Sequence, residues 1–118
     1  AAMMGIGDAV VRMGDMFSKG LFVEKDQKAA LRMYFSARDI AYEDLDDFGM
    51  QQVYSDAMLR IGNCHYFGEG TEKDLTYAVH CYADALHFFE LREKRGDDYS
   101  SAGYNKTKEM LLKAVSEL

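Results

Sequence analysis

Two pairs of adjacent residues, Cys64-His65 and His80-Cys81, carry the most reactive side chains of this chain. Two thiolates and two imidazoles could hold zinc tetrahedrally, and the two cysteines could instead form a disulfide. Neighbouring residues on a helix point about 100° apart, so the four side chains do not readily converge on one ion. Packing in a core is the first interpretation, with a Cys64–Cys81 disulfide and a metal site as alternatives.

The sequence has no pattern of a catalytic site. His87 is expected on the outside of a helix, and no serine or carboxylate stands at a spacing that suggests a catalytic triad. A phosphate-binding loop and a complete set of metal ligands are missing as well. We therefore expect no enzyme activity, no catalytic residue, no metal and no cofactor.

Six polar, charged or aromatic residues could bind another protein. They point away from the apolar side of their helices and form two sets at matching positions, 48 residues apart. The six residues are Arg12, Asp15, Lys19, Arg60, Asn63 and Phe67. Arginine and aromatic side chains dominate the binding energy of many interfaces. One hypothesis is a ladder in which the two arginines clamp the carboxylates or backbone carbonyls of a peptide.

The same face has a simpler interpretation as a solvated helix surface. Asp8 precedes Arg12 by four residues, and Asp56 precedes Arg60 by the same spacing. Such acid-then-base pairs support an isolated helix by about 0.2–0.5 kcal/mol each. Both interpretations stay open at the level of the sequence.

An internal repeat decides which elements carry these residues. Residues 8–38 and 56–86 match without a gap, and 11 of the 31 positions are identical. A repeat of this length is typical of stacked supersecondary units. Gly14 and Gly62 recur inside helices, where glycine costs about 1 kcal/mol relative to alanine. We expect each glycine to contact a small residue of the partner helix, Ala30 or Ala78, with a tyrosine closing the layer.

The apolar periodicity and the capping residues predict about five helices. The first spans residues 3–18 and ends at Gly20, and its inward face should hold Ala9, Met13, Gly14 and Phe17. Aspartate caps should begin the next three helices: Asp26 the second, Asp46 or Asp47 the third, and Asp74 the fourth. The fourth helix should end at Lys94, Arg95 and Gly96. Asp97-Asp98 should open a fifth, with Gly103, Thr107, Met110, Leu111, Ala114, Val115 and Leu118 inward. The fold class is therefore an all-α, right-handed α-α superhelix.

The order in which these residues recur within the chain points to a family. The pattern Ala-x-x-x-Met-Gly-x-x-Phe-x-x-Gly-x-x-Val-x-x-Asp-x-x-x-Ala-x-x-x-Tyr-x-x-Ala runs from Ala9 to Ala37 and returns, with changes, from Ala57 to Ala85. It resembles the Sel-one-like repeat, a relative of the tetratricopeptide repeat with two antiparallel helices per unit. We expect repeat one at about 3–44, repeat two at about 47–95 and a capping helix at about 97–118. Phe22 replaces the second loop glycine, so the first loop should differ from the second.

The resemblance implies a protein-interaction scaffold, of a kind common in bacteria, that binds a protein or peptide in its concave groove. It implies no catalysis. The alternative is a regulatory or targeting domain of a larger enzyme or signalling protein. An array this short has exposed end faces, so self-association through them is a further expectation.

Composition limits the other classes of partner. The chain has 118 residues and a net charge of −6, which disfavours binding to nucleic acid or to anionic lipid. It has no proline, as an array of helices with short turns allows. The first residue is Ala1, so we expect a processed chain or a fragment of a longer protein.

Overall fold

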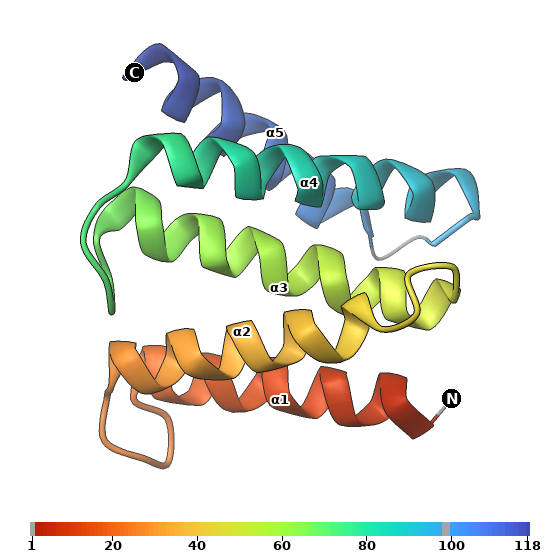
Figure 1. Ribbon diagram of the computed structural model, residues 1–118, viewed down its shortest axis with the longest axis horizontal. Coiled ribbons are helices and arrows are strands. Elements are labelled where there is room, and N and C mark those ends of the chain that lie inside the picture. The colour runs from red at the N-terminus through yellow and green to blue at the C-terminus, as the bar shows by residue number, and fades with distance from the viewer. Residues whose placement is uncertain (1, 98–99) are drawn as a thin grey trace.

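The periodic segments of the sequence form five helices in the computed structural model, which describes residues 2–97 and 100–118, with side chains from residue 5 onwards (Figure 1). The helices are α1 (Ala2–Lys19), α2 (Gln27–Tyr42), α3 (Phe48–Phe67), α4 (Leu75–Lys94) and α5 (Ser100–Ser116). These described residues contain no strand, and none of their helices is long and apolar enough to span a membrane. The predicted all-α fold is confirmed. Asp98 lies outside the described residues.

Aspartate side chains begin three of the helices. Asp26, Asp47 and Asp74 each accept a hydrogen bond, of 3.0–3.1 Å, from the backbone N–H three residues later. These bonds satisfy backbone donors that a helix start leaves unpaired. At the other ends, Gly68 and Gly96 take left-handed conformations that stop α3 and α4.

Consecutive helices run antiparallel, and the α1–α2 hairpin stacks beside the α3–α4 hairpin (Figure 1). The two loops of the repeats, residues 20–26 and 68–74, lie at the same end of the stack. Helix α5 packs on α4 and also contacts α3. Alanines let the helices approach closely, and seven of them are completely buried: Ala30, Ala37, Ala41, Ala57, Ala78, Ala85 and Ala114.

The repeated glycines lie directly under tyrosine rings. A Cβ atom added to Gly14 would lie 2.5 Å from Cε1 of Tyr34, and one added to Gly62 would lie 2.7 Å from Cε1 of Tyr82. The expectation of a close approach is right, but the expected partners Ala30 and Ala78 are not the nearest atoms. The flat tyrosine ring fills the space above the glycine, and the alanines are buried elsewhere in the same layers.

The two repeat loops have the same backbone conformation, contrary to the sequence-based expectation. Phe22 has φ +64°, which matches φ +78° at its counterpart Gly70. Leu21 and Glu69 donate to carbonyls five residues earlier, at 3.0 and 2.8 Å. The hydrogen bonds of the loop therefore hold the backbone in place, and the phenylalanine adopts a conformation that favours glycine.

The outer face of α1 corrects another expectation. Met13 is 46% exposed, whereas its counterpart Ile61 is fully buried, and Ala9 is exposed where Ala57 is buried. Helix α3 packs this face against α2, whereas no helix among the described residues covers the equivalent face of α1. The expected inward residues Val115, on α5, and Leu118, beyond its end, are exposed. The helix contacts its neighbours through Thr107, Met110 and Ala114 instead.

Substituting Gly62→Ala should lower the free energy of unfolding by about 1–3 kcal/mol, because the new methyl group overlaps the buried ring of Tyr82. Urea denaturation followed by circular dichroism measures the change. Gly5→Ala is the matched control, since nothing lies within 4 Å of a Cβ at that position of α1. Equal stability of Gly62→Ala and the wild type would contradict the close contact.

Substituting Phe22→Gly should raise the free energy of unfolding by about 1 kcal/mol. A left-handed conformation costs a non-glycine residue about 1–2 kcal/mol, and the greater freedom of glycine in the unfolded chain offsets only part of that gain. Gly68→Ala, at φ +71°, should destabilise the chain by a similar amount under the same measurement. A loss of stability in Phe22→Gly would show that the phenylalanine ring makes a stabilising contact.

Candidate functional site

A hollow of about 320 Å³ lies between α1 and α3. We call it the α1–α3 hollow, and its lining residues are Asp15, Ser18, Lys19, Tyr34, Leu59, Arg60, Asn63, Cys64, Phe67 and Glu69. Five of the six residues of the candidate partner-binding surface are in this set. The sixth, Arg12, lines a neighbouring hollow of about 320 Å³ further along the same helices.

Asp15 is the centre of the polar contacts in the α1–α3 hollow. Its two carboxylate oxygens accept hydrogen bonds from Nε and Nη2 of Arg60, at 2.7 and 3.0 Å. The hydroxyl group of Tyr34 donates a third bond to Oδ1, at 2.6 Å. Because Asp15 and Tyr34 belong to repeat one and Arg60 to repeat two, this side chain connects the two repeats.

These contacts shift the pKa values of the groups involved. Burial alone would raise the pKa of Asp15, but the hydrogen bonds from Arg60 and Tyr34 and the positive charge of Arg60 outweigh it, so the pKa lies below 3.8. Burial and the bond to Asp15 both raise the pKa of Tyr34. At neutral pH the carboxylate is therefore ionised and the tyrosine is protonated.

Arg60 does not pair with the carboxylate of Asp56, as the four-residue spacing suggested. Its Nη1 donates to the backbone carbonyl of Asp56 at 2.9 Å, while the Asp56 carboxylate accepts from the buried Arg92 at 3.0 Å. Arg92 belongs to α4, so its pairing with Asp56 is a tertiary contact that helix spacing does not reveal. Arg92 also donates to the nearby Asp97 at 2.9 Å.

The arginine-ladder hypothesis places Arg12 and Arg60 along one groove, but the two side chains line different hollows. Arg12 is exposed and lies 3.6 Å from Asp8. Because the Nε, Nη1 and Nη2 groups of Arg60 all donate within the chain, this arginine positions the site.

The remaining residues of the surface are better placed to meet a partner. Lys19 is exposed, and Phe67 is 56% exposed at the end of α3. Asn63 accepts the hydroxyl of Tyr82 through Oδ1 at 2.6 Å, so its amide nitrogen remains as a donor. The hollow thus offers a cation, an aromatic ring and an amide within one small area.

Both cysteines and His65 pack in the core, as the first interpretation expected, but that interpretation is wrong for His80, which is exposed on the surface of α4. Cys64 and Cys81 are buried and unbonded, so the disulfide alternative is wrong. Burial raises the pKa of Cys64 to about 11 and that of Cys81 to about 12, which keeps both thiols protonated and unreactive at neutral pH. Nδ1 of His65 lies 2.9 Å from the backbone carbonyl oxygen of Ile61, and its ring contacts the ring of Tyr77 at a tilt of 58°. Among the described residues no group of three metal-ligating side chains occurs.

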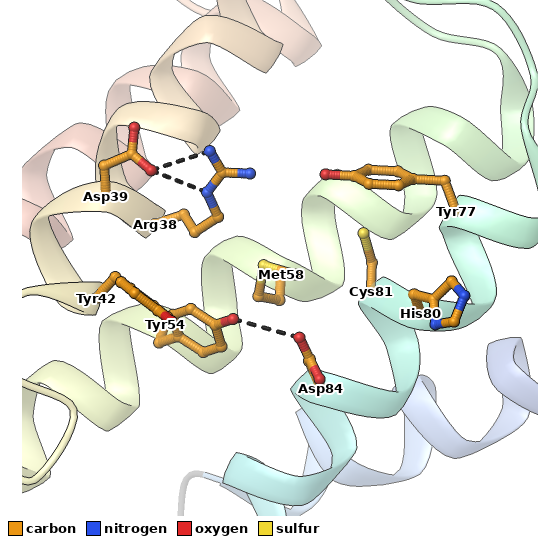
Figure 2. Close-up of a pocket in the computed structure, with 9 residues that line it drawn as sticks. All are labelled: Arg38, Asp39, Tyr42, Tyr54, Met58, Tyr77, His80, Cys81 and Asp84. Atoms are coloured by element: carbon orange, nitrogen blue, oxygen red, sulfur yellow. Dashed lines mark hydrogen bonds and ion pairs between the residues drawn. The ribbon is translucent and has the colours of Figure 1, made fainter.

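A second hollow, of about 370 Å³, was not predicted from the sequence. We call it the tyrosine groove, and it lies between α2 and α4 above α3 (Figure 2). Its lining residues are Arg38, Asp39, Tyr42, Tyr54, Met58, Tyr77, His80, Cys81 and Asp84. The three tyrosines occupy different positions of three helices, so neither helical periodicity nor the 48-residue repeat marks them as a group.

Polar groups stand on both sides of the tyrosine groove. The Tyr54 hydroxyl donates to Asp84 at 3.4 Å, and Arg38 pairs with Asp39 at 2.9 Å (Figure 2). Burial and the negative charge of Asp84 raise the pKa of Tyr54 to about 12. The ring of Tyr42 lies 6.2 Å from that of Tyr54 and forms an exposed edge of the groove.

Comparison with known proteins identifies the repeats. The family model of the Sel1 repeat matches residues 7–39 and 55–89, which together form more than half of the chain. No curated protein and no solved structure matches. The two matched segments coincide with the two stacked hairpins, and each contains one glycine–tyrosine contact.

Substituting Asp15→Asn should lower the free energy of unfolding by about 1–2 kcal/mol at pH 7, because Arg60 loses its charged partner in a half-buried place. The amide still accepts from Tyr34, as Asn63 does from Tyr82. Since the pKa of Asp15 is lower in the folded chain, its stabilisation is complete above pH 3.8 and is lost as the pH falls through the folded-state pKa.

The difference between wild type and Asp15→Asn should therefore shrink as urea denaturation is repeated from pH 5 down to about pH 2.5. Asp8→Asn is the control, because its ion pair with Arg12 is exposed and contributes at most about 0.5 kcal/mol. A difference between wild type and Asp15→Asn that does not change with pH would exclude the carboxylate as its source.

Proposed function

The chain belongs to the Sel1-repeat family, whose repeats are generally protein–protein interaction modules, and we propose that it binds a peptide or protein segment along the α1–α3 face. The observation that carries the proposal is the gathering of Lys19, Asn63 and Phe67 around one hollow between the first helices of the two repeats. An exposed aromatic ring beside a cation and an amide donor is the type of surface on which binding energy concentrates.

The polar contacts behind this surface support a preorganised site. Asp15 and Arg60 hold each other across the repeat junction, so a ligand meets a hollow that is already shaped. Rigid sites lose less entropy on binding. The amide of Asn63 and the ammonium group of Lys19 suit a segment with backbone carbonyls and an acidic side chain, and Phe67 suits an apolar neighbour in that segment.

The end faces support a second proposal, that the chain associates with itself or docks onto the rest of a larger protein. The exposed Met13 and Ile6 lie on the face of α1 that corresponds to the face α3 buries against α2. Burying an exposed apolar helix face of this kind against another protein surface lowers the free energy. The same face could dock onto the rest of the protein if the chain is a regulatory or targeting domain of a larger enzyme or signalling protein.

A display library of random peptides, selected on the whole chain, tests the main proposal. The best peptides should lose at least about tenfold in affinity, measured by titration calorimetry, when Phe67→Ala or Lys19→Glu is introduced. Both positions are exposed, so neither change should affect folding. Tyr42→Ala, in the tyrosine groove, is the control and should leave the affinity unchanged. Peptides that bind all three variants like the wild type would place binding away from the α1–α3 hollow.

A further inference from the structure

Phe22 is the most exposed large apolar residue of the described chain. Its side chain is 96% exposed at φ +64°, and its neighbours Leu21 and Val23 are exposed as well. A bulky residue with a positive φ is an outlier that persists only where the surrounding structure imposes it. Three consecutive exposed apolar residues on one loop, at a cost in stability, suggest a role in binding.

Stacking of repeats does not explain this side chain. The counterpart Gly70 contacts the start of α2, and a Cβ there would lie 2.4 Å from the carbonyl oxygen of Gln27. A repeat stacked ahead of repeat one in the same way would meet the Cβ of Phe22 with its backbone. The two loops share one backbone conformation, but glycine at position 70 lets the loop of repeat two nest against a helix, whereas Phe22 in the loop of repeat one presents a side chain outward.

The tyrosine groove has the size and lining to hold an aromatic side chain. Its volume of about 370 Å³ is at the lower end of the range for ligand sites, which suits a single ring with its backbone. Met58 and Cys81 lie between Arg38 on one wall and Tyr77 on the other (Figure 2). Aromatic rings in contact at offset or edge-to-face angles gain stability beyond the area that they bury.

Charge favours the meeting of these two surfaces. Residues 19–28, around Phe22, carry three lysines and two acids. The lining of the groove holds two carboxylates, Asp39 and Asp84, and one base, Arg38, and residues 43–47, which follow α2, add four acids and no base. In a chain of net charge −6, contact between a basic loop and an acidic groove reduces the repulsion between two copies.

We propose that Phe22 of one molecule inserts into the tyrosine groove of a second copy of the chain, so that molecules associate head to tail. The contact is heterologous, since the loop and the groove are different surfaces. One loop in one groove buries less area than a stable dimer requires, so the association is weak and concentration-dependent. The interface is separate from the α1–α3 hollow and does not rest on the proposed peptide binding.

Sedimentation velocity over a concentration series of the whole chain tests the proposal. The mean sedimentation coefficient should rise with concentration, and Phe22→Gly and Tyr42→Ala should each lower the association constant at least about tenfold. Both residues are exposed, and glycine suits the backbone at position 22, so loss of folding does not confuse the result. Raising the salt concentration should weaken the association of the wild type as well, because salt screens the attraction between the loop and the groove.

A mixture of the two variants gives the decisive measurement. Tyr42→Ala keeps an intact Phe22 and Phe22→Gly keeps an intact groove, so the mixture should form a one-to-one complex that neither variant forms with itself. Phe67→Ala should leave wild-type association unchanged. Met13→Lys, on the outer face of α1, should leave it unchanged too, because a loss of association in that variant would assign self-association to the end face of α1 and not to the tyrosine groove. A monomer at all concentrations, association that survives Phe22→Gly, or a mixture that stays monomeric would each overturn the proposal.

Discussion

The close contact between a helix glycine and a tyrosine ring determines how each repeat is built. Gly14 and Gly62 have no side chain, so Tyr34 and Tyr82 lie flat against the facing helix and their hydroxyls reach the residue that follows the glycine. The ring fixes the spacing within the hairpin, and the hydroxyl fixes its rotation. Both the hydrophobic layer and the polar hollow depend on this one arrangement, which is made twice in the chain.

The residue after the glycine differentiates the two repeats. In repeat one it is Asp15, which binds Tyr34 and also Arg60 of the next repeat, whereas in repeat two it is the neutral Asn63. A charge is stabilised where a guanidinium group from the neighbouring hairpin lies within hydrogen-bond distance. The packing within a repeat is thus common to both units, and the connection between repeats is carried by charge.

Much of the fold can be read from the sequence, because spacing and capping act locally. The aspartate caps, the helix bounds and the repeat all follow from residues close together in the chain, and the Sel1 match agrees with them. The partners of Arg60 and Arg92 could not be read in this way, since Asp15 and Asp56 belong to other helices. The tyrosine groove was missed for the same reason, because its residues come from three helices. The conformation of the loop at Phe22 was also missed, since the backbone hydrogen bonds of the loop override the preference of phenylalanine for a negative φ.

The link between Asp15 and Arg60 gives the array a direction. Arg12 occupies in repeat one the place of Arg60 in repeat two, so copies of repeat one joined in tandem would carry both an acid for the following unit and a base for the preceding one. Copies of repeat two would have Asn63 in place of the acid and would lose every such link. Longer solenoids engineered from this chain would therefore be built from its first unit, with glycine at position 22 so that each loop can nest.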